Sequence, residues 1–117
     1  MPAPLWKQHP EPHDFPAALD YLEMLLAPDE AARAVERLQQ ADTVVKKAKD
    51  ILRASGLPLL PKENTHVSEN IAKVQQGEKL SPVLLLRGRP LVIADGYHRV
   101  CAVYYLSEDL EIPCRLV

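Results

Sequence analysis

Residues 91–102 read Leu-Val-Ile-Ala-Asp-Gly-Tyr-His-Arg-Val-Cys-Ala, and this stretch decides the fold. Its apolar run 91–94 predicts a short buried strand, which Asp95 and Gly96 bring to an end. From 97 to about 106 the pattern predicts a helix. A strand that leads so directly into a helix is typical of a sheet with helices packed on it.

The start of that helix predicts an anion site, because the free backbone N–H groups there favour negative charge. Gly96 lets the backbone approach a ligand closely, since it has no Cβ. Arg99 can form two parallel hydrogen bonds to a phosphate, and His98 can donate one bond or transfer a proton. A structural interpretation stays open, in which Asp95 caps the helix, Arg99 pairs with Asp95 and His98 is a half-buried histidine.

Further short elements flank this stretch. Strands are predicted at 57–60, 83–86 and 112–117, and a helix that Gly77 ends is predicted between the first two. The order is then strand, helix, strand, strand, helix, strand. This order indicates an α+β fold, a mixed sheet with helices packed on it.

The preceding part of the chain predicts a helical extension, residues 14–57, with three short helices. Asp14 is the expected N-cap of the first helix. The third is expected to begin at Asp42 or Thr43, to turn Val44 inward and to end at Gly56. Helices this short need packing against another part of the fold to persist.

Residues 1–13 predict an extended arm, because four of them are prolines. Leu5 and Trp6 are its candidate docking points. The arm holds no apolar signal core, so we expect a cytoplasmic protein.

The composition excludes several classes of protein. The chain has 117 residues, 47% of them hydrophobic, and no apolar run approaches the roughly 18 residues of a membrane-spanning helix. Two cysteines are too few for a disulfide scaffold. The net charge of −2 argues against a duplex-DNA partner, because proteins that bind duplex DNA usually carry a surplus of basic residues.

The charge is unevenly distributed along the chain. Residues 1–42 hold three basic and eight acidic side chains, whereas residues 43–99 hold ten basic and five acidic ones. This segregation indicates either an anion-binding face or a helical extension with its own solvated acidic face.

Residues 58–117 resemble the ParB/sulfiredoxin-like superfamily. The resemblance rests on the Pro-hydrophobic strand at 80–85, Leu-Ser-Pro-Val-Leu-Leu, and on the Gly-x-x-Arg-x-x-Ala helix start at 96–102. It implies a ParB/sulfiredoxin-like mixed sheet with helices, preceded here by the three-helix N-terminal extension. It also implies nucleotide phosphates at the helix start, with Gly96, Tyr97, His98, Arg99 and the upstream Lys79 as the binding residues.

The branches of the superfamily differ at this motif. Sulfiredoxins have a reactive cysteine where this chain has Tyr97, so we expect no sulfiredoxin chemistry. Partition ParB proteins need a further DNA-reading domain, for which we expect no room in this chain. The nearest short match is to the free serine kinases, whose Asp-Gly-His-His-Arg is similar to the sequence at 95–99. Those enzymes take their base from the loop before the preceding helix, which points to Glu63, with His66 as a residue that positions substrate.

The residues and the resemblance together predict a small ParB-like protein that binds a nucleotide or another phosphate. The expected nucleotide is ATP, ADP or CTP, together with Mg²⁺. As an enzyme it would transfer a phosphoryl group to a small hydroxyl substrate or hydrolyse a phosphoester, with Glu63, Asp95 and His98 as catalytic residues and Asp95 at the metal. One alternative is a non-catalytic module in which nucleotide occupancy controls a protein or nucleic-acid partner. Another is a nuclease, for which three clustered acids are expected and the sequence offers Asp95 and Glu63. Glu63 has a structural alternative too, as part of a turn before a helix capped by Thr65. A homodimer is compatible with each of these.

Overall fold

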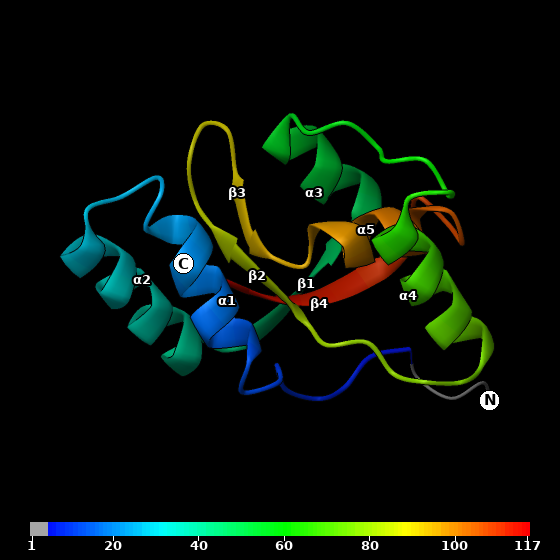
Figure 1. Cartoon of the computed structure of the whole chain (residues 1–117), viewed down its shortest axis with the longest axis horizontal. Helices are drawn as coiled ribbons and strands as arrows, with labels where there is room; N and C mark the ends of the chain where they lie inside the picture. The colour runs from blue at the N-terminus through cyan, green and yellow to red at the C-terminus, as the bar shows by residue number, and fades with distance from the viewer. Residues whose placement is uncertain (1–4) are drawn as a thin grey trace.

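A four-stranded mixed sheet lies at the centre of the fold, and helices cover both of its faces (Figure 1). The structure is a computed structural model that describes residues 5–117, so the prolines at 2 and 4 lie outside the described residues. The strands lie in the order β1-β4-β2-β3, with β4 parallel to β2 and the outer pairs antiparallel. The strands are β1 (Thr43–Lys47), β2 (Val83–Leu86), β3 (Val92–Asp95) and β4 (Glu111–Leu116). The predicted α+β class is confirmed.

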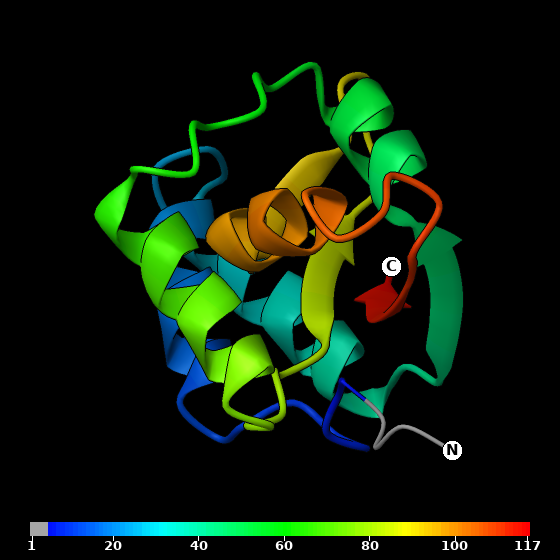
Figure 2. The same cartoon turned by 90° about the vertical axis from the view of Figure 1, so that its right-hand side faces the viewer.

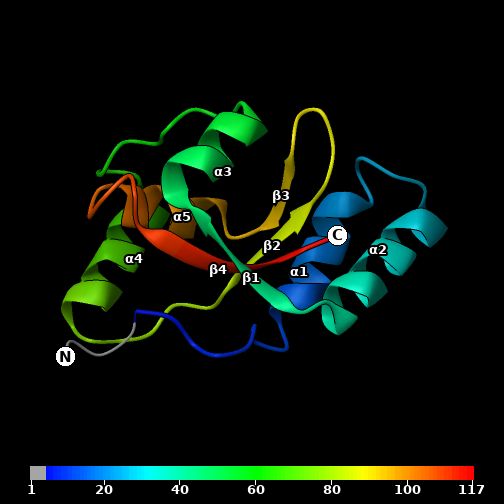
Figure 3. The ribbon, with the colours of Figure 1, turned by 180° about the vertical axis from the view of Figure 1, so that it is seen from behind.

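The helices form one layer on each face of the sheet (Figures 1 and 3). The first layer holds α1 (Asp14–Leu22) and α2 (Pro28–Gln40). The second holds α3 (Ala48–Ser55), α4 (Thr65–Gln75) and α5 (Tyr97–Tyr104), with α4 packed along α5. None of the helices in the described part of the chain is long and apolar enough to cross a membrane.

Successive residues of β2 contribute to two different cores, because side chains along a strand point to alternate faces. Val83 and Leu85 are buried beneath α3, α4 and α5, whereas Leu84 is buried against α1 and α2. The same alternation places Ile93 in the core beneath α3, α4 and α5, and Ala94 in the core against α1 and α2. A strand covered on both faces is apolar at every position, which is why the predicted runs at β2 and β3 are continuous.

The prediction of a helix beginning at Asp42 or Thr43 is wrong for its first turn. Residues 43–47 form β1, and only from Ala48 does the chain become helical. Threonine and two valines in succession favour a strand, and pairing with β4 stabilises it. Val44 is accordingly 39% exposed rather than turned into a helical core. The predicted end of the helix at Gly56 is confirmed, with φ of 69° there.

The predicted strand at 57–60 is also wrong, because this segment is irregular. Two tyrosine hydroxyls hold it instead. The hydroxyl of Tyr97 donates to the carbonyl of Pro58, and that of Tyr105 donates to the carbonyl of Leu60 at 2.6 Å. The segment therefore crosses α5 as a tethered loop that leads into α4 (Figure 2).

The described part of the arm docks where the sequence predicts. Trp6 forms an isolated parallel bridge with Leu80 and packs against the core beneath α3, α4 and α5. The amide of Lys7 donates to the carbonyl of Leu80 at 2.7 Å, and the amide of Leu80 donates to the carbonyl of Leu5 at 2.8 Å. These contacts bring the arm beside the segment that enters β2.

Candidate functional site

The junction between β3 and α5 requires glycine. Gly96 has φ of 111°, a conformation that side-chain-bearing residues rarely adopt. A Cβ at this position would lie 2.9 Å from both Arg99 Nη2 and Val83 Cγ2. The absent side chain thus allows α5 to begin directly against β2 and Arg99.

The start of α5 has no side-chain cap among the described residues. Gly96 occupies the N-cap position, and Asp95 does not cap the helix as the structural interpretation allowed. The start of α4 differs, because the side chain of Asn64 accepts hydrogen bonds from the amides of His66 and Val67. Asn64, rather than the predicted Thr65, is the cap there. Within the described residues, the amides in the first turn of α5 therefore remain available to donate hydrogen bonds to another acceptor.

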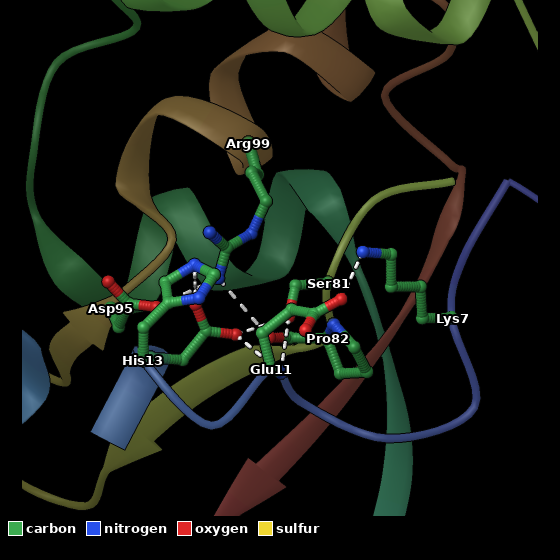
Figure 4. Close-up of polar contacts among 8 residues, drawn as sticks. Lys7, Glu11, His13, Ser81, Pro82, Asp95 and Arg99 are labelled. Atoms are coloured by element: carbon green, nitrogen blue, oxygen red, sulfur yellow. Dashed lines mark hydrogen bonds and ion pairs between the residues drawn. The ribbon is translucent and has the colours of Figure 1, made fainter. Parts of the chain in front are cut away.

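One side-chain nitrogen of Arg99 donates hydrogen bonds to two acceptors (Figure 4). Its Nη2 donates to Asp95 Oδ2 at 3.0 Å and to the carbonyl of Pro82 at 3.2 Å. Its Nε is buried and has no hydrogen-bond acceptor among the described residues. The predicted pairing of Arg99 with Asp95 exists, and it leaves part of the hydrogen-bonding capacity of the guanidinium unused.

A second buried carboxylate, Asp14, lies beside this pair. Asp14 is the first residue of α1 with His13 at the N-cap position, so the prediction that Asp14 caps this helix is wrong. Its Oδ2 accepts hydrogen bonds from the Ser81 hydroxyl and, at 3.0 Å, from the amide of Glu11. Ser81 in turn accepts from the same amide at 3.0 Å, which joins the arm, α1 and the segment before β2 (Figure 4).

Burial raises the pKa of Asp95 above its usual value. The guanidinium of Arg99 opposes this rise in pKa, whereas the adjacent Asp14 carboxylate adds to it. Arg99 is thus the main influence that favours the charged form of Asp95, and it does not fully offset the effect of burial.

A pocket of about 370 Å³, which we call the main pocket of the candidate site, lies between α4 and the start of α5. Half of its lining comes from α4 and the other half from the junction of β3 with α5. The lining residues are His66, Glu69, Asn70 and Lys73 from α4, and Asp95, Gly96, His98 and Arg99 from the junction. Cations, acids and an amide thus face one polar space.

A smaller pocket of about 130 Å³, the arm pocket, adjoins the main pocket. Both pockets are lined by Asn70, Lys73 and Arg99. The arm pocket adds Lys79, Ser81 and residues of the arm and of the start of α1. Arg99 therefore faces both pockets.

His98 has an electrostatic environment that favours its neutral form. Burial lowers the pKa of His98, and the nearby His66 and Arg99 lower it further. The rings of His66 and His98 have their centroids 4.9 Å apart, and His66 Nδ1 lies 3.7 Å from Glu69 Oε2. A neutral imidazole facing a polar pocket can accept a proton or donate a hydrogen bond.

The structure brings together most of the residues predicted from the sequence, but not all of them. His66, Asp95, Gly96, His98 and Arg99 line the main pocket, and Lys79 lines the arm pocket. The other two predicted residues line neither pocket. Tyr97 directs its hydroxyl to the loop over α5, and Glu63 is exposed in the turn before α4.

Asn70 and Lys73 are not predicted from the sequence. With His66 they recur at positions i, i+4 and i+7 of α4, so they share one face of that helix. This polar stripe is a usable signal, but it does not reveal which element the stripe faces.

Within residues 5–117 no group of three or more histidine, cysteine, aspartate or glutamate side chains is arranged to hold a metal ion. Comparisons of the chain with protein-family models, with curated proteins and with solved structures found no match. The likeness to the ParB/sulfiredoxin-like superfamily therefore stays a prediction.

Proposed function

We propose that this protein binds a phosphate-bearing ligand, a nucleotide, at the start of α5. Gly96 admits the phosphate to the first-turn amides, and His98 and Arg99 contact it from α5. Lys73 extends the site from α4, and Lys79 extends it into the arm pocket. The observation that carries the proposal is the convergence of Lys73, His98 and Arg99 on one pocket at an uncapped helix start.

The charges of the main pocket support a ligand that brings its own cation. Lys73 and Arg99 are balanced there by Glu69 and Asp95. A nucleotide with bound Mg²⁺ suits such a mixed site, because Mg²⁺ is commonly held by one or two carboxylates together with substrate phosphates. Asp95 is the residue that we expect to face the ion, and Mg²⁺ would supply neutralisation of phosphate charge.

A phosphoryl-transfer reaction at this site would need a proton acceptor for the hydroxyl substrate. Glu63 is exposed and lies outside both pockets, whereas His98 lies in the main pocket with its pKa lowered. We therefore assign the proton-accepting role to His98 rather than to Glu63. A non-catalytic module would use the same binding residues without turnover.

Thermal unfolding with a panel of nucleotides tests the proposal. ATP, ADP and CTP with and without Mg²⁺ are compared with adenosine, and at least one nucleotide is expected to raise Tm. At a ligand concentration about 100-fold above Kd, binding adds about 2.7 kcal/mol, which corresponds to roughly 10 °C for a chain of this size. If adenosine raises Tm as much as the nucleotides, or if no ligand raises it, the proposal is wrong.

Turnover separates the enzyme from the module. Release of nucleoside diphosphate from the bound triphosphate, with the phosphoryl group passing to water in the absence of the hydroxyl substrate, measures turnover. Turnover that is lost in His98→Gln and retained in Glu63→Ala supports phosphoryl transfer with His98 as the base. Binding without release of diphosphate supports the module. Loss of turnover in Glu63→Ala with binding retained would show that Glu63, rather than His98, accepts the proton.

A further inference from the structure

Among the described residues, no other strand pairs with the outer edge of β1. All five residues of β1 are exposed, and the strand lies at the outer edge of the sheet, beyond β4 (Figure 2). Val45 at its centre is 51% exposed, an unusual degree for an apolar residue within a strand. Exposed strand edges present unpaired N–H and C=O groups that another strand can join.

The register of β1 on β4 shows which backbone groups point outward. Val44 pairs with Cys114 and Lys46 with Ile112, and one step further the amide of Ala48 donates to the carbonyl of Leu110 at 3.0 Å. Hydrogen-bonded pairs alternate along an antiparallel ladder, so Val44 and Lys46 also turn their N–H and C=O groups toward β4.

The other three residues of the strand, Thr43, Val45 and Lys47, therefore turn their N–H and C=O groups to the open edge. A strand that joins this edge has three evenly spaced pairs of backbone groups to bind.

We propose that β1 is the interface through which two copies of this chain form a dimer, by antiparallel pairing of β1 with β1 about a two-fold axis at Val45. In this register Val45 faces Val45 of the second copy, and Thr43 faces Lys47 of the second copy. Each of the three outward residues of one copy meets an outward residue of the other, so every outward N–H gains an acceptor. The two sheets then form one continuous sheet, and the interface is isologous.

The charges along β1 fit this pairing. Lys46 faces Val44 of the second copy, and its diagonal neighbours on the same face are Asp42 and Lys46 of the second copy. The two symmetric Lys46–Asp42 pairs attract, and they outnumber the single repulsive Lys46–Lys46 pair. Lys47 is already close to an acid of its own chain, since its Nζ lies 3.9 Å from Asp109 Oδ1. No lysine of one copy is directly opposite a lysine of the other. A parallel in-register pairing would instead place Lys46 opposite Lys46 and Lys47 opposite Lys47.

The dimer leaves the candidate site free. The main pocket lies at α4 and the β3–α5 junction, and β3 is at the opposite edge of the sheet from β1. The proposal therefore does not depend on ligand binding, and it can be tested on the unliganded chain.

The test uses charge at the two-fold axis. Val45→Lys and Val45→Glu each place like charges directly opposite one another in the dimer, while the exposed position leaves the monomer fold intact. In sedimentation velocity over a concentration series, the wild-type chain is expected to form a dimer. Each variant alone is expected to weaken the dimer about tenfold or more, and an equal mixture of the two is expected to form a heterodimer.

Thermal unfolding of each variant by circular dichroism provides the control for folding. A wild-type chain that stays monomeric throughout the series overturns the proposal. A dimer that both charged variants retain also overturns it, because its interface then lies elsewhere. Growth of the wild-type chain into large aggregates instead of a dimer overturns the closed two-fold pairing.

Discussion

Gly96→Ala is the substitution that tests the structure of the candidate site most sharply. The new Cβ would lie 2.9 Å from Val83 Cγ2, and Val83 is fully buried in β2, so it has no room to yield. It would also lie 2.9 Å from Arg99 Nη2, which can move only by giving up its hydrogen bonds to Asp95 and Pro82. The backbone adds a separate cost, because φ is 111°.

The size of the effect follows from these two contributions. A side chain in a left-handed conformation costs about 1–2 kcal/mol, and overpacking a core costs about 1–3 kcal/mol. Gly96→Ala is therefore expected to lower the free energy of unfolding by about 2–5 kcal/mol. Gly77→Ala is the matched control, because Gly77 has φ of 80° and a Cβ added there would meet no atom within 4 Å. That control is expected to lose only the backbone contribution, about 1–2 kcal/mol.

Urea unfolding of both variants beside the wild-type chain measures the two contributions. The difference between the variants isolates the contact of the new Cβ with Val83 and Arg99. Equal losses in Gly96→Ala and Gly77→Ala would refute the close packing of the β3–α5 junction on β2.

Three further predictions concern the surroundings of the site. Asp14→Ala leaves the Ser81 hydroxyl without its acceptor, while the Glu11 amide keeps only its hydrogen bond to Ser81. Urea unfolding should therefore show a loss of about 1–3 kcal/mol, and Asp14→Asn should lose less; an unchanged Asp14→Ala would contradict the buried cluster. Because the pKa of His98 is lowered in the folded state from its ordinary 6.5, the unfolded chain binds more protons there as pH falls from about 7 to about 5, and stability falls. His98→Gln should flatten this fall, and an unchanged pH profile would count against the burial of His98. Tyr105→Phe should lower the free energy of unfolding by about 1 kcal/mol, because the carbonyl of Leu60 loses its hydrogen-bond donor. Tyr104→Phe is the control and should leave that free energy unchanged, because its hydroxyl donates only to the exposed Glu108 at 3.4 Å. Equal losses in the two variants would show that Tyr105 does not hold the loop.

Local sequence signals are sufficient where a single element decides the structure. The continuous apolar runs at β2 and β3, Gly56 after α3 and the Asp95-Gly96 junction each carry their signal within a few residues. The α+β class and the position of the candidate site follow from those signals.

Pairing between distant segments is what the sequence does not show. Helical spacing of Val44 and Ala48 predicts one helix, but residues 43–47 are held as a strand by β4, which lies far along the chain. Asp14 has the local pattern of a helix cap, yet its carboxylate accepts a hydrogen bond from Ser81, 67 residues away. Each of these errors arises where a tertiary contact overrides a local preference.

The same limit applies to the candidate site. Glu63 is a candidate through its place in a loop, and only the three-dimensional path of that loop into α4 shows that it lies outside both pockets. Lys73 is missed because its role depends on α4 packing along α5. Asp95, Gly96, His98 and Arg99 of the β3–α5 junction need no such information, and they line the main pocket, whereas Tyr97 does not.

The most direct test of the central proposal is calorimetric titration of the folded chain with ATP and Mg²⁺, repeated with Arg99→Ala and Arg53→Ala. Arg53 is the matched control, since it is also a helical arginine paired with an aspartate, but its side chain is 85% exposed and outside both pockets. The wild-type chain and Arg53→Ala are expected to bind equally well. Arg99→Ala is expected to weaken binding by about 10- to 100-fold, as the loss of a charged hydrogen-bond donor implies. Equal binding by Arg99→Ala and the wild-type chain would contradict a phosphate site at the start of α5.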